Sequence, residues 1–566
     1  MPSRVSTLGI LMIVLVVSQS ALSQVSYVEA SAGLELPGME NGRTEIEFGD
    51  VNGDGHPDLV SIGDHGSPFV NTDEHGIMVW FGDGAGNWSL DQNGDFGYGG
   101  IALGDVNNDG QMDVGYGMHH DYSGSDFGDQ LLEVSLGDGT GRNWTPWDDG
   151  LATDGESWGM FGVDFADIDN DGDLDVGSIA FGCCAGVHVY LNHGDGTWTP
   201  SFGFTGGNSQ MEFIFGDVNG DGLADFACSH GLGDGAVYLG DGLGGFTPAD
   251  GNLPPEGTVG YAGISLGDVN DDGRDDLAFV TDDGGLAVWT WVAIDTWQNL
   301  SGTLPSSGDF RATQIADMDL DGHGDLVAFA NGLMVVYGGD GAGQWVELTS
   351  FATPASCAYS AMRAGVDADH NGYPDIVLVA EEDCDVWFGG TNRPRFYGEA
   401  SSPASQWLHP MFPIGGETFV AGSVRFIDWT AAVTGEAVPT VNIELSQEGV
   451  SGPWALISSS LPNNGRYQWS LDSNLRSSTD NHLRFTMDDA TVVTVEPFTI
   501  LGGPPLGDAD GDADVDLLDY EQFQLCFTGP DGPATGDCAA IFDWEPDGDI
   551  DEMDFAAFQR AFTGGD

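Results

Sequence analysis

The residues best suited to chemistry in this chain are acidic and lie in short loops that could hold a cation. The first loop spans residues 50–58 and carries oxygen-bearing side chains at positions 1, 3, 5 and 9: Asp50, Asn52, Asp54 and Asp58. Gly55 permits a sharp turn, and the carbonyl of His56 could add one more oxygen. Ca²⁺ accepts about 6–8 oxygen ligands in flexible loops. Carboxylates this close repel each other unless a cation lies among them, so we expect a Ca²⁺ site here.

The same pattern occurs six more times, with starting points 49 to 62 residues apart. The expected ligands of these loops are Asp105, Asn107, Asp109 and Asp113; Asp167, Asp169, Asp171 and Asp175; Asp217, Asn219, Asp221 and Asp225; Asp268, Asn270, Asp272 and Asp276; Asp317, Asp319, Asp321 and Asp325; and Asp367, Asp369, Asn371 and Asp375. Self-similarity at such a period indicates a repeat architecture. One acidic loop could be a solvated turn, but seven favour cation sites. Asn371 stands where the other copies carry Asp, so we expect the seventh site to be the weakest.

The composition of the 566-residue chain excludes several classes of function. Its net charge is −78, from 91 acidic and 13 basic residues. A chain this acidic does not suit nucleic-acid backbones or anionic membrane surfaces, which attract basic proteins. With 41% hydrophobic and 11% aromatic residues, it is not a disordered acidic tail either. We expect several folded domains.

The first 23 residues are typical of a secretory signal peptide. Arg4 supplies the positive charge, residues 8–17 are apolar, and residues 21–23 offer small side chains for cleavage. A membrane anchor is the alternative, but the apolar run is shorter than the roughly 20 residues that cross a bilayer. We therefore expect an exported protein that meets millimolar Ca²⁺.

The seven cysteines fit an oxidising compartment, and their odd number leaves at least one outside an intrachain pair. Cys526 and Cys538 flank a short Gly/Pro-rich insertion, and we expect a disulfide between them. Cys357 and Cys384 flank the seventh loop and could bridge it. The sequence leaves Cys183, Cys184 and Cys228 unassigned.

The rest of each repeat predicts short strands. A second apolar strand follows the loop strand, then a Gly-Asp-Gly turn and an aromatic residue, as in residues 79–84 and Trp88. Asp-Gly between such strands indicates a hairpin. About four short strands per repeat match one blade of a β-propeller. In the last repeat we place the third strand at residues 386–388 and find no clear strand beyond Arg395. Residues 25–36 are expected to supply the missing outermost strand.

These loops and their spacing resemble the FG-GAP/VCBS repeats of integrin-α-like propellers. The resemblance implies a mainly β protein with a seven-bladed β-propeller over residues 24–395.

Residues 396–502 change in character, with fewer Asp and more Ser, Thr and Val. Strand-like runs lie at residues 418–420, 424–429, 441–445, 454–457, 466–469, 482–487 and 492–500. This number of strands predicts a β-sandwich. The segments 415–417, 427–429 and 465–469 resemble the Ig-like module of Ser/Thr-rich surface proteins. Trp429, Trp454 and Trp469 could stack on sugars, but core positions are favoured.

Residues 503–566 contain two acidic loops of twelve residues, each followed by a short helix. The expected ligands are Asp508, Asp510, Asp512, Asp516 and Asp519 in the first loop, and Asp543, Glu545, Asp547, Asp551 and Asp554 in the second. This duplication resembles a type I dockerin, which implies a cohesin-type protein partner. Ala513 replaces the usual glycine, so the first of these sites is expected to be weaker, and the Cys526–Cys538 insertion also departs from the family.

No catalytic motif stands out. The chain lacks a G-x-S-x-G elbow, an H-E-x-x-H helix and a phosphate-binding loop. The histidines His119, His120, His193 and His230 are better explained as solvated loop residues than as a metal site.

We therefore expect a secreted Ca²⁺-binding protein whose propeller recognises a protein or a polysaccharide. The alternative is a carbohydrate-active hydrolase or lyase with its site in the propeller channel. A convergent set of His, Arg and acidic residues in that channel would favour the enzyme.

Overall fold

The structure is a computed structural model that describes most of the chain. The described residues are 25–34, 44–62, 77–93, 99–117, 131–156, 160–180, 186–205, 209–230, 236–254, 263–294, 296–357, 360–386, 389–435, 438–488, 490–494, 496–502, 509, 517–530, 532–534, 537–542 and 549–561. The proposed signal peptide lies outside these residues. Within them, no helix is long and apolar enough to cross a membrane.

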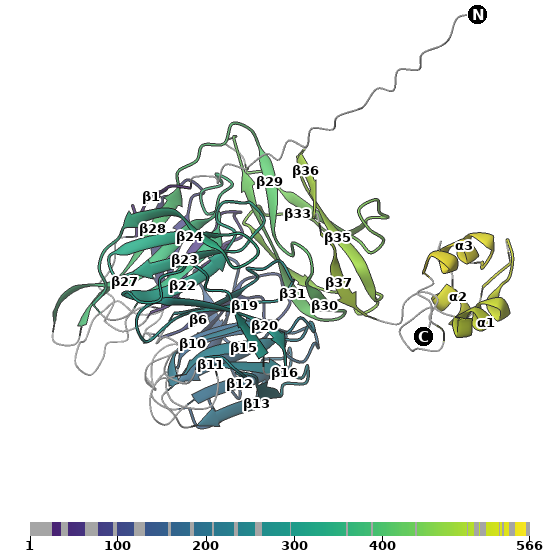
Figure 1. The fold of residues 1–566 in the computed structure, drawn as a ribbon, viewed down its shortest axis with the longest axis horizontal. Helices are drawn as coiled ribbons and strands as arrows, with labels where there is room; N and C mark the ends of the chain where they lie inside the picture. The colour runs from purple at the N-terminus through teal and green to yellow at the C-terminus, as the bar shows by residue number, and fades with distance from the viewer. Residues whose placement is uncertain are drawn as a thin grey trace, which may run out of the picture.

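Seven antiparallel sheets of four strands each make up the first part of the chain (Figure 1). From the inner to the outer strand, the first six are: β2 (Ile46–Gly49), β3 (Asp58–Ile62), β4 (Ile77–Gly82) and β5 (Trp88–Asn93); β6 (Ile101–Gly104), β7 (Asp113–Gly117), β8 (Leu132–Gly137) and β9 (Trp144–Pro146); β10 (Met160–Ala166), β11 (Asp175–Ala180), β12 (Gly186–Asn192) and β13 (Trp198–Thr205); β14 (Ser209–Gly216), β15 (Asp225–His230), β16 (Val237–Gly240) and β17 (Phe246–Pro248); β18 (Ile264–Gly267), β19 (Asp276–Val280), β20 (Leu286–Ala293) and β21 (Thr296–Asn299); β22 (Phe310–Ala316), β23 (Asp325–Ala330), β24 (Leu333–Gly339) and β25 (Trp345–Ala352). The seventh consists of β26 (Ser360–Val366), β27 (Asp375–Val386), β28 (Gly389–Glu399) and β1 (Tyr27–Glu29).

The inner strands of these sheets form a closed ring. Each of β2, β6, β10, β14, β18 and β22 contacts the inner strand of the next sheet, and β26 contacts β2. The N-terminal strand β1 completes the seventh sheet, with Tyr27 opposite Glu399 on β28. This arrangement is a seven-bladed β-propeller and confirms the expected fold of this region. The expected closure by an N-terminal strand is also confirmed.

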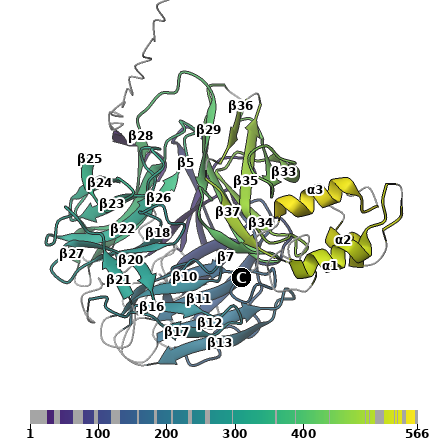
Figure 2. The ribbon, with the colours of Figure 1, turned by 45° about the vertical axis from the view of Figure 1, so that its right-hand side comes forward.

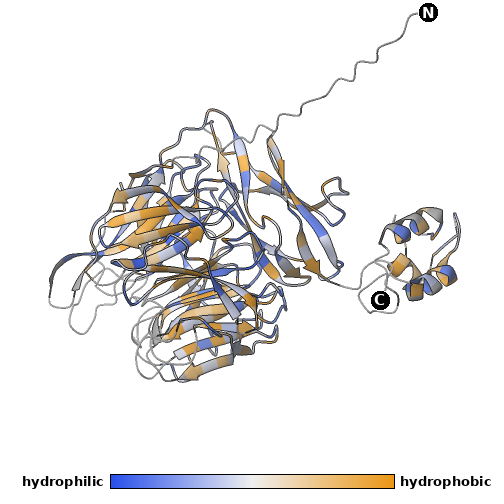
Figure 3. Ribbon diagram, in the orientation of Figure 1, coloured by the Kyte–Doolittle hydropathy of each residue, from blue (hydrophilic) through white to orange (hydrophobic). Residues whose placement is uncertain are grey.

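Apolar side chains between neighbouring blades form the core (Figure 3). The aromatic residue after each Gly-Asp-Gly turn begins the outermost strand and is buried, as Trp88, Trp198 and Trp345 illustrate. Such aromatic anchors bury large apolar areas at the rim of a blade.

One expectation for the last blade is wrong. The third strand is β28, which begins at Gly389 and continues to Glu399, beyond the expected boundary at residue 395. Val386, first assigned to this strand, is instead the last residue of an extended β27 and pairs with Gly389 of β28, and residues 387–388 lie outside the described residues. Sequence pattern alone could not distinguish the tip of a long hairpin from a strand in the core of the blade.

Two further sheets follow the propeller. The smaller consists of β29 (Trp407–Phe412), β31 (Val424–Ala432) and β34 (Arg466–Ser470). The larger consists of β30 (Thr418–Val420), β37 (Phe498–Leu501), β35 (Ser478–Met487), β32 (Val441–Ser446), β33 (Ala455–Leu461) and β36 (Ala490–Val493). Both sheets contribute to one core that includes Trp429, Trp469 and Phe485. Trp429 and Trp469 are therefore core residues, whereas Trp454 is half-buried beneath the guanidinium of Arg484.

Two sequence expectations for this region need correction. The sequence analysis did not predict strand β29, in which His409 and Pro410 interrupt the apolar residues. The single strand expected at residues 492–500 is divided into β36 and β37, which pair with different parts of β35.

The C-terminal part contains three helices, α1 (Leu517–Cys526), α2 (Asp537–Phe542) and α3 (Glu552–Ala561), which lie together at one side of the sheets (Figures 1 and 2). Helices α1 and α3 pack through aromatic rings, with the centroids of Phe523 and Phe558 5.2 Å apart. A disulfide joins Cys526 and Cys538, whose Cα atoms are 5.4 Å apart, and connects α1 to α2. The short helix α2 was not expected from the sequence.

Candidate metal centres

The acidic loops join the first and second strands of each blade and share one backbone geometry. In all seven, the Oδ2 atom of the first Asp accepts the N–H of the glycine at position 6, over 2.7–3.2 Å. These glycines have φ between 77° and 97°, where a side chain would be strained. The bond closes the loop between positions 1 and 6.

The Asp at position 9 of each loop has a second role that the sequence did not reveal. All seven of these residues are fully buried at the start of the second strand: Asp58, Asp113, Asp175, Asp225, Asp276, Asp325 and Asp375. Each Oδ2 accepts the backbone N–H of loop position 2, as Val218 donates to Asp225 over 3.0 Å. In six of the loops, Oδ1 also accepts an N–H from the third strand, as Gly240 donates to Asp225 over 2.8 Å. This carboxylate therefore ties the loop to two strands.

Loops three, six and seven fit a hard divalent cation best. The carboxylates at their positions 1, 3 and 9 offer oxygens that all lie within 4.8 Å of one another. One buried oxygen in each has no hydrogen-bond partner: Asp169 Oδ1, Asp319 Oδ1 and Asp367 Oδ1. Oxygens 2.3–2.6 Å from a central Ca²⁺ would have about this spacing, and a buried carboxylate oxygen without a partner is costly. These donor sets fit the expected Ca²⁺.

The other four loops have Asn at position 3, so a neutral amide replaces one of the three carboxylates at positions 1, 3 and 9. The seventh loop, expected to be the weakest, has its Asp at position 3 and belongs to the better-formed group. That this site binds Ca²⁺ more weakly than the other six stays a prediction, but its carboxylates at positions 1, 3 and 9 are arranged as in loops three and six.

Burial raises the pKa of the carboxylate at position 9 of each loop in the metal-free protein. Loss of solvation raises the pKa of Asp58, Asp113, Asp225 and Asp325 to about 8. The pKa values of Asp175, Asp276 and Asp375 lie well above the usual value for the same reason. A bound cation would compensate these charges, because an opposite charge within a few ångströms favours the ionised form.

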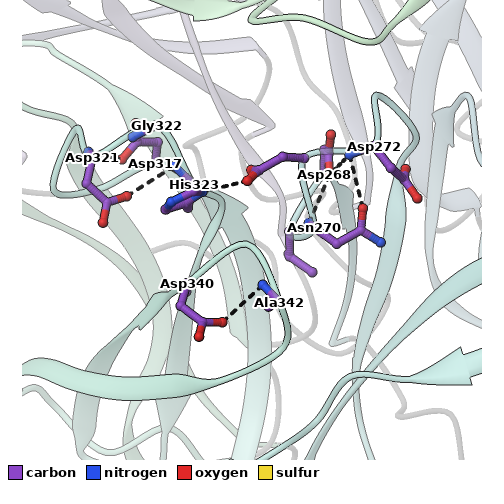
Figure 4. Close-up of polar contacts among 12 residues, drawn as sticks. Asp268, Asn270, Asp272, Asp317, Asp321, Gly322, His323, Asp340 and Ala342 are labelled. Atoms are coloured by element: carbon purple, nitrogen blue, oxygen red, sulfur yellow. Dashed lines mark hydrogen bonds and ion pairs between the residues drawn. The ribbon is translucent and has the colours of Figure 1, made fainter.

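The fifth loop differs from the others because it contains its own cation. Arg274, at loop position 7, donates from Nε to Asp272 Oδ1 over 3.1 Å and from Nη2 to Asp272 Oδ2 over 2.6 Å. Both oxygens of an expected ligand are therefore engaged by a guanidinium. Figure 4 shows this loop beside the sixth, where His323 forms an ion pair with Asp271 of the fifth loop over 2.7 Å.

A cavity of about 560 Å³ lies on the propeller axis. The inner strands of the blades line one side, and β29, β31 and the hairpin before β34 line the other. Arg363 lies in this cavity, in contact with Glu47 and 4.0 Å from Glu45. Arg466 forms a bidentate pair with Asp428 over 2.7 and 2.9 Å. The channel therefore holds Arg and acidic residues, and no histidine lines it among the described residues.

The C-terminal loops are described only in part. Asp508, Asp510, Asp512, Asp516, Asp543, Glu545 and Asp547 lie outside the described residues. In the second loop, Asp551 and Asp554 offer oxygens within 4.8 Å of each other and of Asp549, a residue the sequence analysis did not select. In the first loop, Asp519 accepts the N–H of Ala509 over 2.6 Å.

Among the described residues, the remaining sequence candidates form no further metal site. His119 and His120 lie outside the described residues, as does the side chain of His230, and His193 is exposed. Cys357 is disulfide-bonded; its expected partner, the Cys384 side chain, is outside the described part, as are Cys183 and Cys184. The thiol of Cys228 is buried inside the fourth blade.

Comparisons with known proteins agree with the propeller. The FG-GAP-like repeat model matches residues 50–116, 179–228 and 217–279. No curated protein matches the chain.

Among solved structures, an Agrocybe aegerita lectin that recognises non-reducing terminal N-acetylglucosamine is 19% identical, with 54% of this chain and 80% of that chain covered and a TM-score of 0.37. BBS1N in complex with ARL6DN is 11% identical, with 66% and 96% covered and a TM-score of 0.41. A mutant NanB sialidase from Streptococcus pneumoniae is 11% identical, with 66% and 69% covered and a TM-score of 0.34. TM-scores this low assign neither a ligand nor an activity. The chain therefore carries FG-GAP-like repeats on a β-propeller.

Proposed function

We propose that this protein is a secreted, calcium-stabilised recognition protein. Its propeller would bind a polysaccharide or a surface protein, and its C-terminal unit would act as a dockerin that docks onto a cohesin-type protein. The sheets of residues 407–501 would form the Ig-like sandwich between them. The observation that carries the calcium part is the set of buried carboxylate oxygens without partners in loops three, six and seven.

The role of calcium in this proposal is structural. A cation in each loop neutralises carboxylates that burial would otherwise protonate, and it fixes the turn between the two inner strands of a blade. Ligands that bind only the folded state stabilise it. The dockerin part of the proposal is supported by helices α1 and α3, which belong to the two halves of the duplicated sequence. Phe523 of α1 packs against Phe555 and Phe558 of α3.

Thermal melting of the full chain tests the calcium part. In millimolar Ca²⁺ the melting temperature should exceed that of metal-stripped protein by many degrees, and Mg²⁺ should substitute poorly because it demands smaller octahedral sites. Equal melting temperatures with and without Ca²⁺ would contradict the proposal. A glycan array and a cohesin pull-down, both in Ca²⁺, test the two recognition surfaces separately.

The second candidate is a carbohydrate-active hydrolase or lyase, and one observation favours it. Arg363 and several carboxylates converge on the axial cavity, and burial raises the pKa of Glu47 to about 7 and that of Asp164 to about 6. Such perturbed carboxylates are common at catalytic sites but also in structural ion-pair networks. A polysaccharide depolymerisation screen decides between the candidates: new reducing ends or unsaturated sugars that Glu47→Gln abolishes would establish the enzyme. Binding without any product would favour recognition.

A further inference from the structure

The sheets that follow the propeller lie over the face that carries the acidic loops. We call residues 407–501 the cap. The cap touches every loop: Asn464 at Asp50, Gln468 at Asp105, Val424 at Asp167, Arg425 at Gly222, Gly416 at Gly273, His409 at Asp317 and Ala431 at Asp367. The loop face of the propeller is therefore an interface inside the chain.

Three of these contacts are hydrogen bonds to carboxylate oxygens of expected metal ligands, and His409 Nε2 also lies 3.7 Å from Asp317 Oδ2. The backbone N–H of Val424 donates to Asp167 Oδ2 over 2.8 Å, and that of Ala431 donates to Asp367 Oδ2 over 3.2 Å. The Asn464 side chain donates to Asp50 Oδ2 over 3.2 Å. In the seventh loop, Oδ1 of Asp367 has no partner and faces the other loop carboxylates. The cap thus holds one oxygen of a ligand while the other stays available to a cation.

The charge balance of this interface is unfavourable without a cation. Asp167 is fully buried and Asp367 is 4% exposed, so the docked state keeps these carboxylates out of water. The cap brings few positive groups to the loops; Arg425, on the carbonyl of Gly222, is the clearest among the described residues. Burying charges without compensation costs several kcal/mol per ion, to an order of magnitude. Neutral amide donors offset only part of that cost.

We propose that cation binding in the loops and docking of the cap are thermodynamically linked. This inference rests on the proposed binding of Ca²⁺ to the loops. The cap docks onto the cation-loaded face, and docking in turn raises the affinity of the loops for the cation, since linkage between two binding events is reciprocal. Removal of the cation releases the cap and opens the axial cavity, which the cap covers on this side of the propeller.

The test uses the full chain and variants that weaken docking without touching a loop carboxylate. Arg425→Lys, which keeps the positive charge near Asp167 and Asp217, combined with Gln468→Ala weakens the bond to Gly222 and removes the paired bonds between Gln468 and the Asp105 backbone, which span 2.8 and 2.9 Å. The matched control is Arg484→Gln, because Arg484 pairs with Glu444 inside the cap over 2.6 Å. Equilibrium dialysis with Ca²⁺ measures affinity, and small-angle scattering measures the radius of gyration.

The double variant should bind Ca²⁺ about fivefold more weakly, at the low end of common coupling strengths, and the control should match wild type. Metal-stripped wild type should have a larger radius of gyration while its circular dichroism shows that the β structure persists. Unchanged affinity in a folded double variant would overturn the linkage.

If the double variant fails to fold, Gln468→Ala alone replaces it, since the Gln468 side chain bonds only the backbone of Asp105; weaker Ca²⁺ binding supports the linkage, and unchanged binding contradicts it. Wild type that binds no Ca²⁺ at all would instead refute the proposed function.

Discussion

At the scale of single residues, the most informative position is the ninth of each loop. The sequence predicts a metal ligand there, and the structure adds two backbone hydrogen bonds to the same carboxylate in most loops. A ligand that also holds two strands cannot be replaced without a structural cost, even when no metal is present. The fifth position is different, because its side chain is exposed in five loops, partly exposed at Asp272 and buried only at Asn371.

Two variants of the fourth loop can separate the structural role of position 9 from metal binding at position 5. Asp225→Ala leaves the N–H groups of Val218 and Gly240 without acceptors, and we expect a loss of about 2–6 kcal/mol in the free energy of unfolding, from roughly 1–3 kcal/mol for each of the two groups. Asp221→Ala removes an exposed ligand and only exposed hydrogen bonds, so it should reduce stability mainly in Ca²⁺. Urea unfolding of both variants, in Ca²⁺ and in metal-stripped buffer, checks this. Equal losses for the two variants in metal-free buffer would contradict the assignment.

The raised pKa values predict a pH dependence of the metal-stripped protein. Burial raises the pKa of Asp58 from 3.8 to about 8, so the folded form binds more protons than the unfolded form between those values. Stability should therefore be greatest at the acidic end and fall as the pH rises toward 8. Melting temperatures between pH 5 and 8 measure this fall, and Ca²⁺ should reduce it.

The control for this prediction is Asp58→Asn, which cannot titrate and should show a smaller fall. A melting temperature of metal-stripped wild type that stays constant or rises over this range would contradict the interpretation.

At the scale of elements, the loops show how one repeated motif can diverge. Arg274 places a guanidinium on Asp272 in the fifth loop only, with side chains 29% and 27% exposed. Arg274→Gln should strengthen Ca²⁺ binding at one site by up to about fivefold, since partly exposed ion pairs contribute about 1 kcal/mol or less. Equilibrium dialysis at subsaturating Ca²⁺ should then detect more bound metal per chain. Arg142→Gln removes an ion pair with Asp91 outside the loops and serves as the control; a fifth site that weakens in Arg274→Gln would show that the arginine supports the loop.

The elements also show how much of the fold and of the candidate sites could be predicted from the sequence. The blades, the loop glycines and the aromatic anchors follow from local patterns that repeat, so their register and burial could be anticipated. Docking of the cap could not, because its contacts to Asp167 and Asp367 come from the backbone N–H groups of Val424 and Ala431. Every residue except proline carries such a donor, so residue type gives no signal. The role of Arg274 was missed because it lies between ligand positions and carries the opposite charge.

At the scale of the whole molecule, closure of the ring depends on a strand distant in sequence. Strand β1 pairs with β28, and Arg395 on β28 forms an ion pair with Glu29 over 3.0 Å. Tyr27 inserts its ring beside Phe351, with centroids 5.5 Å apart, and is 9% exposed. A propeller closed in this way has one cooperative core, because every blade packs on two neighbours.

Tyr27→Ala tests whether the closing strand belongs to that cooperative core. Loss of a buried aromatic side chain costs about 3 kcal/mol or more when its surroundings unfold together with it. We therefore expect the whole propeller transition to shift to lower denaturant concentration in Ca²⁺, with its steepness unchanged. Val28→Ala is the matched control, because the neighbouring side chain is 60% exposed and should have little effect. If β1 instead frays independently, Tyr27→Ala would leave the main transition unshifted, and the remaining contacts between the first and seventh blades, such as Phe48 with Phe396, would hold the ring closed.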